Sequence, residues 1–203
     1  MPPHSNQLLF YSKFFLFRLT LMPNSFAPDS LRRIRRLALA VRLLCLVGIV
    51  VMGTLPFVFW AQPDWVARVA AREWELEQMQ LDLGSRLIGL AASLLPSGVI
   101  LYALAQMWSL FGCFAAGELL AHRPARHLRR LGQSLCVLAF AQPLSHTAMV
   151  LALTLGNPAG HRKLQFGLSS DHYLTLMFGL LLLALAHVLG EAARVADENA
   201  EFV

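Results

Sequence analysis

Long apolar runs alternate with short charged segments along most of this chain. Four runs contain no Asp, Glu, Lys or Arg: Leu43–Ala61, Leu87–Gly117, Leu131–Gly160 and His172–Gly190. A helix rises about 1.5 Å per residue, so about 20 apolar residues cross the roughly 30 Å of hydrocarbon in a bilayer. The pattern predicts an all-α, polytopic membrane protein with a four-transmembrane-helix bundle. The predicted spans cover residues 39–61, 87–117, 131–156 and 172–190.

The second apolar run is the longest, at 31 residues. This is more than one span needs and less than two spans and a turn would need. We therefore expect one long or tilted helix, kinked near Pro96. The third run contains Pro143 and ends in the turn-forming sequence Asn157-Pro158-Ala159-Gly160.

The segment between the first two spans, Asp64–Arg86, has an amphipathic pattern. Its apolar residues recur three, four or seven positions apart, with polar residues on the opposite side. The apolar positions are Trp65, Val69, Leu76, Met79, Leu83 and Leu87. We expect an amphipathic outer helix that lies on the membrane surface and continues into the second span, with nearby tryptophans in the interfacial belt.

Residues 1–30 differ from the rest, because their apolar stretch Leu8–Leu21 is short and contains Lys13 and Arg18. A secretory signal fits poorly, since no clean apolar centre or small-residue cleavage site is present. Two interpretations are open. Either translation begins at Met22 and residues 1–21 are not translated, or this extension is an interfacial helix. Residues 31–203 are predicted to form a single membrane domain with an acidic cytoplasmic tail at 191–203.

Composition supports the membrane assignment and changes the meaning of the charge. Of the residues, 57% are hydrophobic and 14% are charged, whereas a soluble domain has about 25% charged residues. The net charge of +5 could suggest nucleic acid, but the basic residues are grouped at the ends of apolar runs. Anionic lipid headgroups explain that grouping, so we expect the bilayer as partner and no direct nucleic-acid binding.

The distribution of Lys and Arg predicts the orientation. Apart from residues 1–30, ten of these basic residues flank one side of the predicted spans and five flank the other side. The richer side includes a basic loop between the second and third spans, with Arg123, Arg126, Arg129 and Arg130. We expect a multi-pass protein of the bacterial inner membrane with both termini and this loop in the cytoplasm.

Several segments resemble one family of small bacterial membrane proteins. They are the loop His122–Gly132, the Gly167-Leu168-Ser169-Ser170-Asp171 segment before the last span, and the acidic end Gly190–Val203. Together with the four spans, they are similar to the family called domain of unknown function 2975, over roughly Leu37 to Val203. Members are often encoded beside a small Cro-type helix-turn-helix regulator, so the resemblance implies a regulatory role. It implies no catalytic residues.

Two pairs of ionisable residues lie at the predicted inner ends of spans two and four. Glu118 and His122 are four residues apart, as are His187 and Glu191, so in a helix each pair shares a face. If the two spans touch, the four side chains form a metal or proton site. The alternative is that each pair faces headgroups and water as a local hydrogen bond.

His146 lies far inside the third run, which places it near the middle of the membrane. With Gln142 and Gln106 it could form a polar path for transport, or it could be a neutral histidine hydrogen-bonded to a neighbouring span. His187 lies at a different depth, so the two histidines do not fit one haem iron. We expect no cofactor.

The sequence contains no phosphate-binding glycine loop, Cys-x-x-Cys, His-Glu-x-x-His or Gly-x-Ser-x-Gly motif. We therefore predict no catalytic residues and no enzyme activity. The favoured hypothesis is a regulatory interaction protein that binds a cytoplasmic partner, such as a small helix-turn-helix regulator. One alternative is a small transporter or export-immunity protein with a polar path around His146. The second alternative is a metal-dependent membrane enzyme that uses Glu118, His122, His187 and Glu191.

Overall fold

The structure is a computed structural model that describes residues 28–74, 76, 79, 81–118, 121–158 and 164–201. Five helices make up the regular structure of these residues. They are α2 (Pro28–Ala61), α3 (Pro63–Glu73), α4 (Leu83–Ala115), α5 (His122–Thr154) and α6 (Ser170–Glu201). Residues 28–30 form the start of α2, while both interpretations of the segment before them fall outside the described residues.

The four long helices are the membrane spans, which confirms the predicted all-α, four-span architecture. Each of α2, α4, α5 and α6 is long and apolar enough to cross a membrane. The second span is one continuous helix, because α4 passes through Pro96 without a break. The helices extend beyond several predicted spans, since α5 begins at His122 rather than near Leu131 and α6 continues to Glu201.

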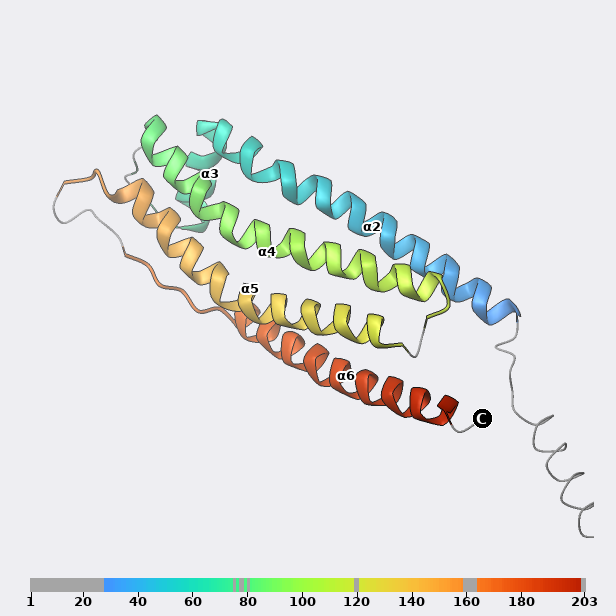
Figure 1. Cartoon of the computed structure of the whole chain (residues 1–203). Helices are drawn as coiled ribbons and strands as arrows, with labels where there is room; N and C mark the ends of the chain where they lie inside the picture. Colours follow the sequence, from blue (N-terminus) through green and yellow to red (C-terminus); the bar gives the residue numbers. More distant parts are fainter. Residues whose placement is uncertain are drawn as a thin grey trace, which may run out of the picture.

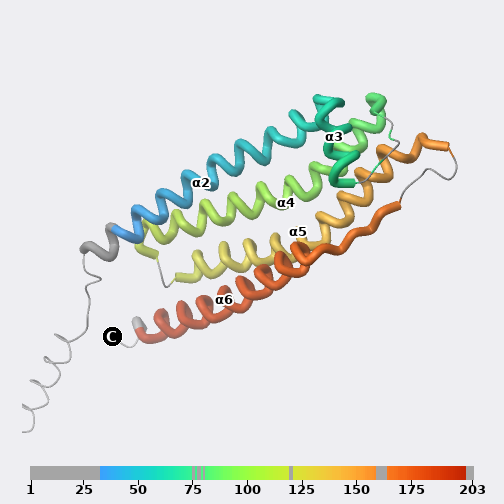
Figure 2. The backbone as a smooth tube through the Cα atoms, turned by 180° about the vertical axis from the view of Figure 1, so that it is seen from behind, coloured from blue at the N-terminus to red at the C-terminus, as the bar shows by residue number. Residues whose placement is uncertain are grey.

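The four spans pack in the order of the chain (Figures 1 and 2). Helix α2 contacts α4, α4 contacts α5, and α5 contacts α6. Among the described residues, no Cα atoms of α2 and α6, or of α4 and α6, lie within 8 Å of each other. The bundle is therefore an open row in which α2 and α6 are the two edges.

The two ends of the row differ. At one end α2 and α5 begin while α4 and α6 finish (Figure 1), and we call it the basic end. At the other end α3 folds back against the tips of the helices, and we call it the capped end. The capped end holds a buried hydrophobic cluster, whose members are Trp60, Val66, Ala70, Leu76, Val150 and Leu153.

The amphipathic segment forms a shorter helix than predicted. Helix α3 ends at Glu73, and the described residues between it and α4 are not helical. Its buried face is Val66 and Ala70, one position away from the predicted Trp65 and Val69. The segment turns at this point because the backbone N–H of Leu76 donates to the carbonyl of Ala70 at 3.0 Å, which places the Leu76 side chain in the protein interior. The prediction of one helix running on into the second span is therefore wrong.

Local sequence signals explain both ends of α4. Asp82 is the N-cap, where its carboxylate accepts from the backbone N–H of Gly84 at 3.1 Å and from the Ser85 hydroxyl. The Ser85 hydrogen bond lowers the pKa of the Asp82 carboxyl below its usual value. At the other end Gly117 has φ +85°, and the N–H of Glu118 donates to the carbonyl of Cys113 at 3.0 Å. This is a Schellman motif, which needs glycine in the left-handed conformation.

Two glycines allow α5 and α6 to approach closely. A Cβ atom on Gly179 would lie 2.7 Å from the Cys136 sulfur and 3.0 Å from the Gly132 carbonyl oxygen. A Cβ atom on Gly132 would lie 2.9 Å from the Gly179 carbonyl oxygen. Such reciprocal small residues are how helices pack in lipid, where no hydrophobic force drives them together.

Helix α6 is displaced toward the basic end. The described residues before it, 164–169, have no regular secondary structure, and the carbonyl of Gln165 accepts a hydrogen bond from the Thr147 hydroxyl of α5 at 3.0 Å. Helix α6 therefore begins beside the middle of α5, and its C-terminal turns continue past the first turn of α5 (Figures 1 and 2). As a result, the buried cluster of the capped end contains no residue of α6.

Candidate functional site

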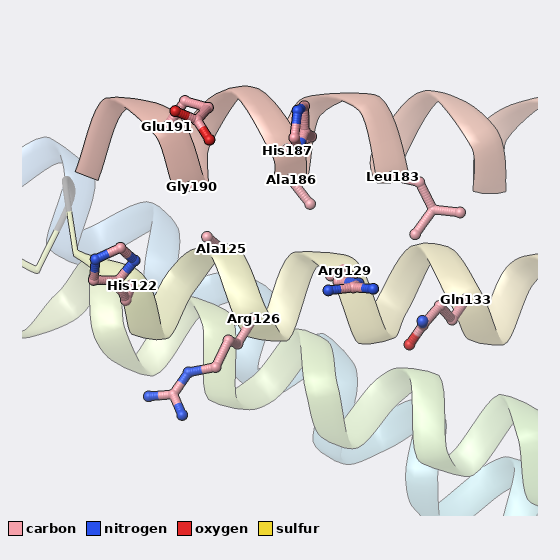
Figure 3. Close-up of a pocket in the computed structure, with 10 residues that line it drawn as sticks. All are labelled: His122, Ala125, Arg126, Arg129, Gln133, Leu183, Ala186, His187, Gly190 and Glu191. Atoms are coloured by element: carbon pink, nitrogen blue, oxygen red, sulfur yellow. The ribbon is translucent and has the colours of Figure 1, made fainter. Parts of the chain in front are cut away.

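A groove of 510 Å³ lies between α5 and α6 at the basic end. Figure 3 shows the polar side chains on its two sides, with His187 and Glu191 on α6 and His122, Arg126, Arg129 and Gln133 on α5. Ala125 and Ala186 point toward the opposite helix between them (Figure 3). A Cβ atom on Gly190 would lie 4.0 Å from the Cβ atom of Ala125. Small residues thus form the floor of the groove and leave room above it.

The Glu191 carboxylate and the His122 imidazole of the groove already have partners. Glu191 accepts two hydrogen bonds from Arg194, at 3.0 Å from Nε and 2.9 Å from Nη2. The Nε2 atom of His122 lies 3.2 Å from a carboxylate oxygen of Asp197. Among the described residues, neither Arg126 nor Arg129 has a carboxylate within ion-pair distance. The groove therefore offers two arginines whose charges are not neutralised by the protein.

The four side chains of the metal alternative do not come together. Glu118 follows α4 and lies 4.0 Å from Arg123, while His122, His187 and Glu191 line the groove between α5 and α6. Helix α5 separates α4 from α6, so the contact between spans two and four that this alternative requires is absent from the described part of the chain. No three His, Cys, Asp or Glu side chains in that part are placed to hold a metal ion.

The predicted polar patch is divided between two levels of the membrane. The amide oxygen of Gln106 on α4 lies 2.9 Å from Nδ1 of His127 on α5, near the basic end. His146 lies in the opposite half of α5, where its ring is 5.8 Å from the Trp74 ring in an edge-to-face arrangement. Gln142 is half-buried one turn before His146. Gln106 and His146 therefore do not meet, because His146 lies beside Trp74 in the half of α5 nearer the capped end.

Two other arginines, Arg86 and Arg42, make contacts within the protein. The Arg86 guanidinium donates to the carbonyl of Trp60 from Nε at 2.9 Å and from Nη2 at 2.6 Å, and to that of Ala61 at 2.8 Å. It thereby satisfies the last carbonyls of α2, which have no partner within the helix. On α2 itself, the Arg42 guanidinium stacks 4.3 Å from the centre of the Trp108 ring of α4, a favourable cation–π contact.

The sequence pattern contains no clear signal for His127, for the small residues of the groove floor, or for the Gly132–Gly179 pair. His127 belongs to the basic segment, and it follows Arg123 by four residues, so in a helix the two share a face. Gly132 belongs to a segment that carries the family resemblance. A weak signal for the close approach was present in the isolated glycines of two apolar runs, because glycine inside a membrane helix favours close packing.

The chemistry that the groove offers is binding. Arginine fits planar anions such as phosphate and carboxylate with two parallel hydrogen bonds. The floor of alanine and glycine supplies space but no reactive group. Of the predicted site residues, the groove therefore unites His122, His187, Glu191, Arg126 and Arg129, while Glu118, Arg123 and Arg130 lie outside it.

Comparison with known proteins agrees with the resemblance found in the sequence. Neither the curated proteins nor the solved structures contain a match to this chain. A family model described as protein of unknown function (DUF2975) matches residues 57–203. This match spans the capped end, the groove and three of the four membrane helices. The chain therefore belongs to the DUF2975 family of multi-pass membrane proteins.

Proposed function

We propose that this protein is a regulatory interaction protein of the bacterial inner membrane, which binds a cytoplasmic protein through the last turns of α6. A small helix-turn-helix regulator is the partner that the family resemblance suggests. The observation that carries the proposal is the offset of α6, whose last turns continue past the first turn of α5 (Figures 1 and 2). At about 1.5 Å per residue, its 32 residues extend for about 48 Å, so a helix of this length can carry its last turns out of the roughly 30 Å of hydrocarbon.

The distribution of charge supports a cytoplasmic position for this end. The basic end has ten arginines in and around its helices, whereas the opposite side has five basic residues in its two connecting segments. Lys and Arg are enriched in cytoplasmic loops of membrane proteins. Because α2 begins and α6 finishes at the basic end, this rule puts both ends of the described chain in the cytoplasm.

The surface of the last turns of α6 fits a protein partner of positive charge. Asp197 and Glu198 are exposed, and each faces one basic group of this chain. Val195 lies one turn before Glu198 on the same side of the helix and is 48% exposed. An apolar side chain next to a carboxylate, on a helix that continues past its neighbours, is a suitable contact for a basic, amphipathic partner surface.

Photo-crosslinking in intact cells tests the proposal. A photoreactive amino acid would replace Val195, and the matched control would place it at Val188, two turns earlier on the same face. Val188 is also exposed, at 64%, but lies within the apolar part of the span. We expect Val195 to form a crosslink with a soluble helix-turn-helix protein and Val188 to form none.

Charge reversal provides a second measurement. The double substitution Asp197→Lys and Glu198→Lys should abolish the Val195 crosslink while leaving the abundance of the membrane protein unchanged. If Val195 gives no more soluble crosslinked protein than Val188, the proposal is wrong. The same holds if charge reversal leaves the crosslink intact, because the carboxylates would then not take part.

A further inference from the structure

We propose that the groove between α5 and α6 binds the phosphate group of an anionic phospholipid. The site is separate from the exposed last turns of α6, so this inference does not depend on the proposed protein partner. It rests on the charges that line the groove, on its position along the helices, and on the apolar surface below it.

Arg129 is the principal contact for the phosphate. It lies on the face of α5 that borders α6 (Figure 3), and among the described residues it has no carboxylate partner. Arg126, one turn away, extends away from α6 in the same view, and its stem lines the groove. An uncompensated arginine in a groove that small residues keep open is suited to a bidentate contact with a phosphate.

The carboxylate of Glu191 does not prevent anion binding. Both of its hydrogen bonds come from Arg194, which also donates to Glu198 at 2.6 Å. The pair therefore contributes little net charge to the groove. His187 lies one turn deeper on the same face of α6 (Figure 3), where its ring can donate a further hydrogen bond to a phosphate oxygen.

The groove becomes apolar toward the middle of the membrane, which favours a lipid over a free phosphate. Its deep end is lined by Leu183, and Leu180 on the same side of α6 is exposed. An acyl chain can lie along these leucines while the headgroup phosphate contacts Arg129. Basic grooves between membrane helices on the cytoplasmic side are known sites for anionic headgroups.

Arg130 is a matched control for Arg129. It has the same charge and is adjacent in the sequence, but it lines a different cavity, of 470 Å³, between α4 and α5. That cavity is mainly apolar, with Leu94, Val99 and Val137 among its lining residues. A general attraction of lipid to positive charge would affect both arginines equally, whereas binding in the groove depends on Arg129.

The test is native mass spectrometry of the purified full-length protein with phosphatidylglycerol and phosphatidylcholine of identical acyl chains. We expect phosphatidylglycerol to bind about fivefold or more tightly than phosphatidylcholine, because only the former has net negative charge. The Arg129→Gln variant should weaken phosphatidylglycerol binding about tenfold, and the Arg130→Gln variant less than about twofold. Equal binding of the two lipids, or equal losses in the two variants, would overturn the proposal.

A competition experiment distinguishes the lipid from a free phosphate. Inorganic phosphate or glycerol 3-phosphate would be added to the complex with phosphatidylglycerol. We expect neither to displace the lipid at equal concentration, because neither covers the leucines below the groove. Displacement at equal concentration would show that the groove selects the phosphate alone, and the assignment to a lipid would be wrong.

Discussion

The capped end and the basic end of this helix row are held together in different ways. At the capped end, side chains from α2, α3, α5 and the segment after α3 share one buried cluster. At the basic end, the contacts that join the ends of α5 and α6 include an exposed ion pair between His122 and Asp197. Buried packing makes large contributions to stability, whereas exposed ion pairs contribute about 0–1 kcal/mol.

This difference separates stability from binding. The capped end contains Trp60, which is 2% exposed, and Arg86, whose donors are directed to backbone carbonyls of α2. The basic end leaves Arg126 and Arg129 without carboxylate partners in the described part of the chain. Substitutions at the capped end should therefore unfold the protein, whereas those at the basic end should change what it binds.

The largest effect should come from Gly89→Ala at the capped end. The new Cβ atom would lie 2.1 Å from the Trp60 ring, which is rigid and enclosed. We expect a loss of about 2–3 kcal/mol in the free energy of unfolding, since overpacking of this kind is typically destabilising by about 1–3 kcal/mol. Unfolding in mixed micelles with increasing SDS would measure it.

Gly112→Ala is the control for this substitution, because it lies in the same helix and its Cβ atom would have no neighbour within 4 Å. We expect it to leave stability unchanged or to raise it slightly, given the higher helix propensity of alanine. Equal stability of the two variants would mean that Trp60 does not pack tightly on Gly89, and the contrast between the ends would be lost.

A smaller loss should follow Arg86→Gln. The shorter, neutral side chain cannot reach both carbonyls, so the C-terminal turn of α2 would keep unsatisfied acceptors. We expect a loss of about 1.5–2 kcal/mol in the same assay, at the lower end of the roughly 1.5–3 kcal/mol that hydrogen bonds to charged groups contribute. Arg68→Gln is the control, since Arg68 is exposed on α3 and should be neutral. A loss at Arg68 as large as at Arg86 would contradict the capping role.

The smallest effect should come from Asp197→Asn at the basic end. It removes the carboxylate that lies 3.2 Å from His122, but both side chains are more than half exposed. We expect less than about 0.5 kcal/mol of change in the free energy of unfolding. Addition of salt should change the stability of the parent protein just as little. A loss above about 1 kcal/mol would show that ion pairs do hold this end together.

The four spans could be predicted from the sequence because hydrocarbon imposes a strong and simple requirement on each segment. Charged residues in the first and last turns weakened the prediction of where helices begin and end. Helix α5 includes Arg123 and Arg130, so its backbone stays helical beyond the uncharged run. The segment between α2 and α4 was harder to predict. Its turn depends on the backbone hydrogen bond from Leu76 to Ala70, which forms in a tertiary core that periodicity does not reveal.

The candidate site depended on which helices are neighbours, and the sequence does not contain that information directly. One alternative placed Glu118 and His187 on touching spans, but α5 lies between their helices. Another grouped Gln106 with His146, whereas Gln106 contacts His127. Depth along a single helix can be counted from residue numbers, whereas the partner of a polar side chain depends on helix order and rotation.

Among the described residues, each span packs only against the spans that come before and after it in the chain. This order also affects how the protein can assemble. As the ribosome delivers α4 to the membrane, its only partner among the earlier spans, α2, is already present, and the same is true for α5 and then α6. No span has to wait for a later one to close a ring. Assembly can therefore proceed in step with synthesis, and a chain stalled after α5 would already contain every helix that contributes to the buried cluster of the capped end.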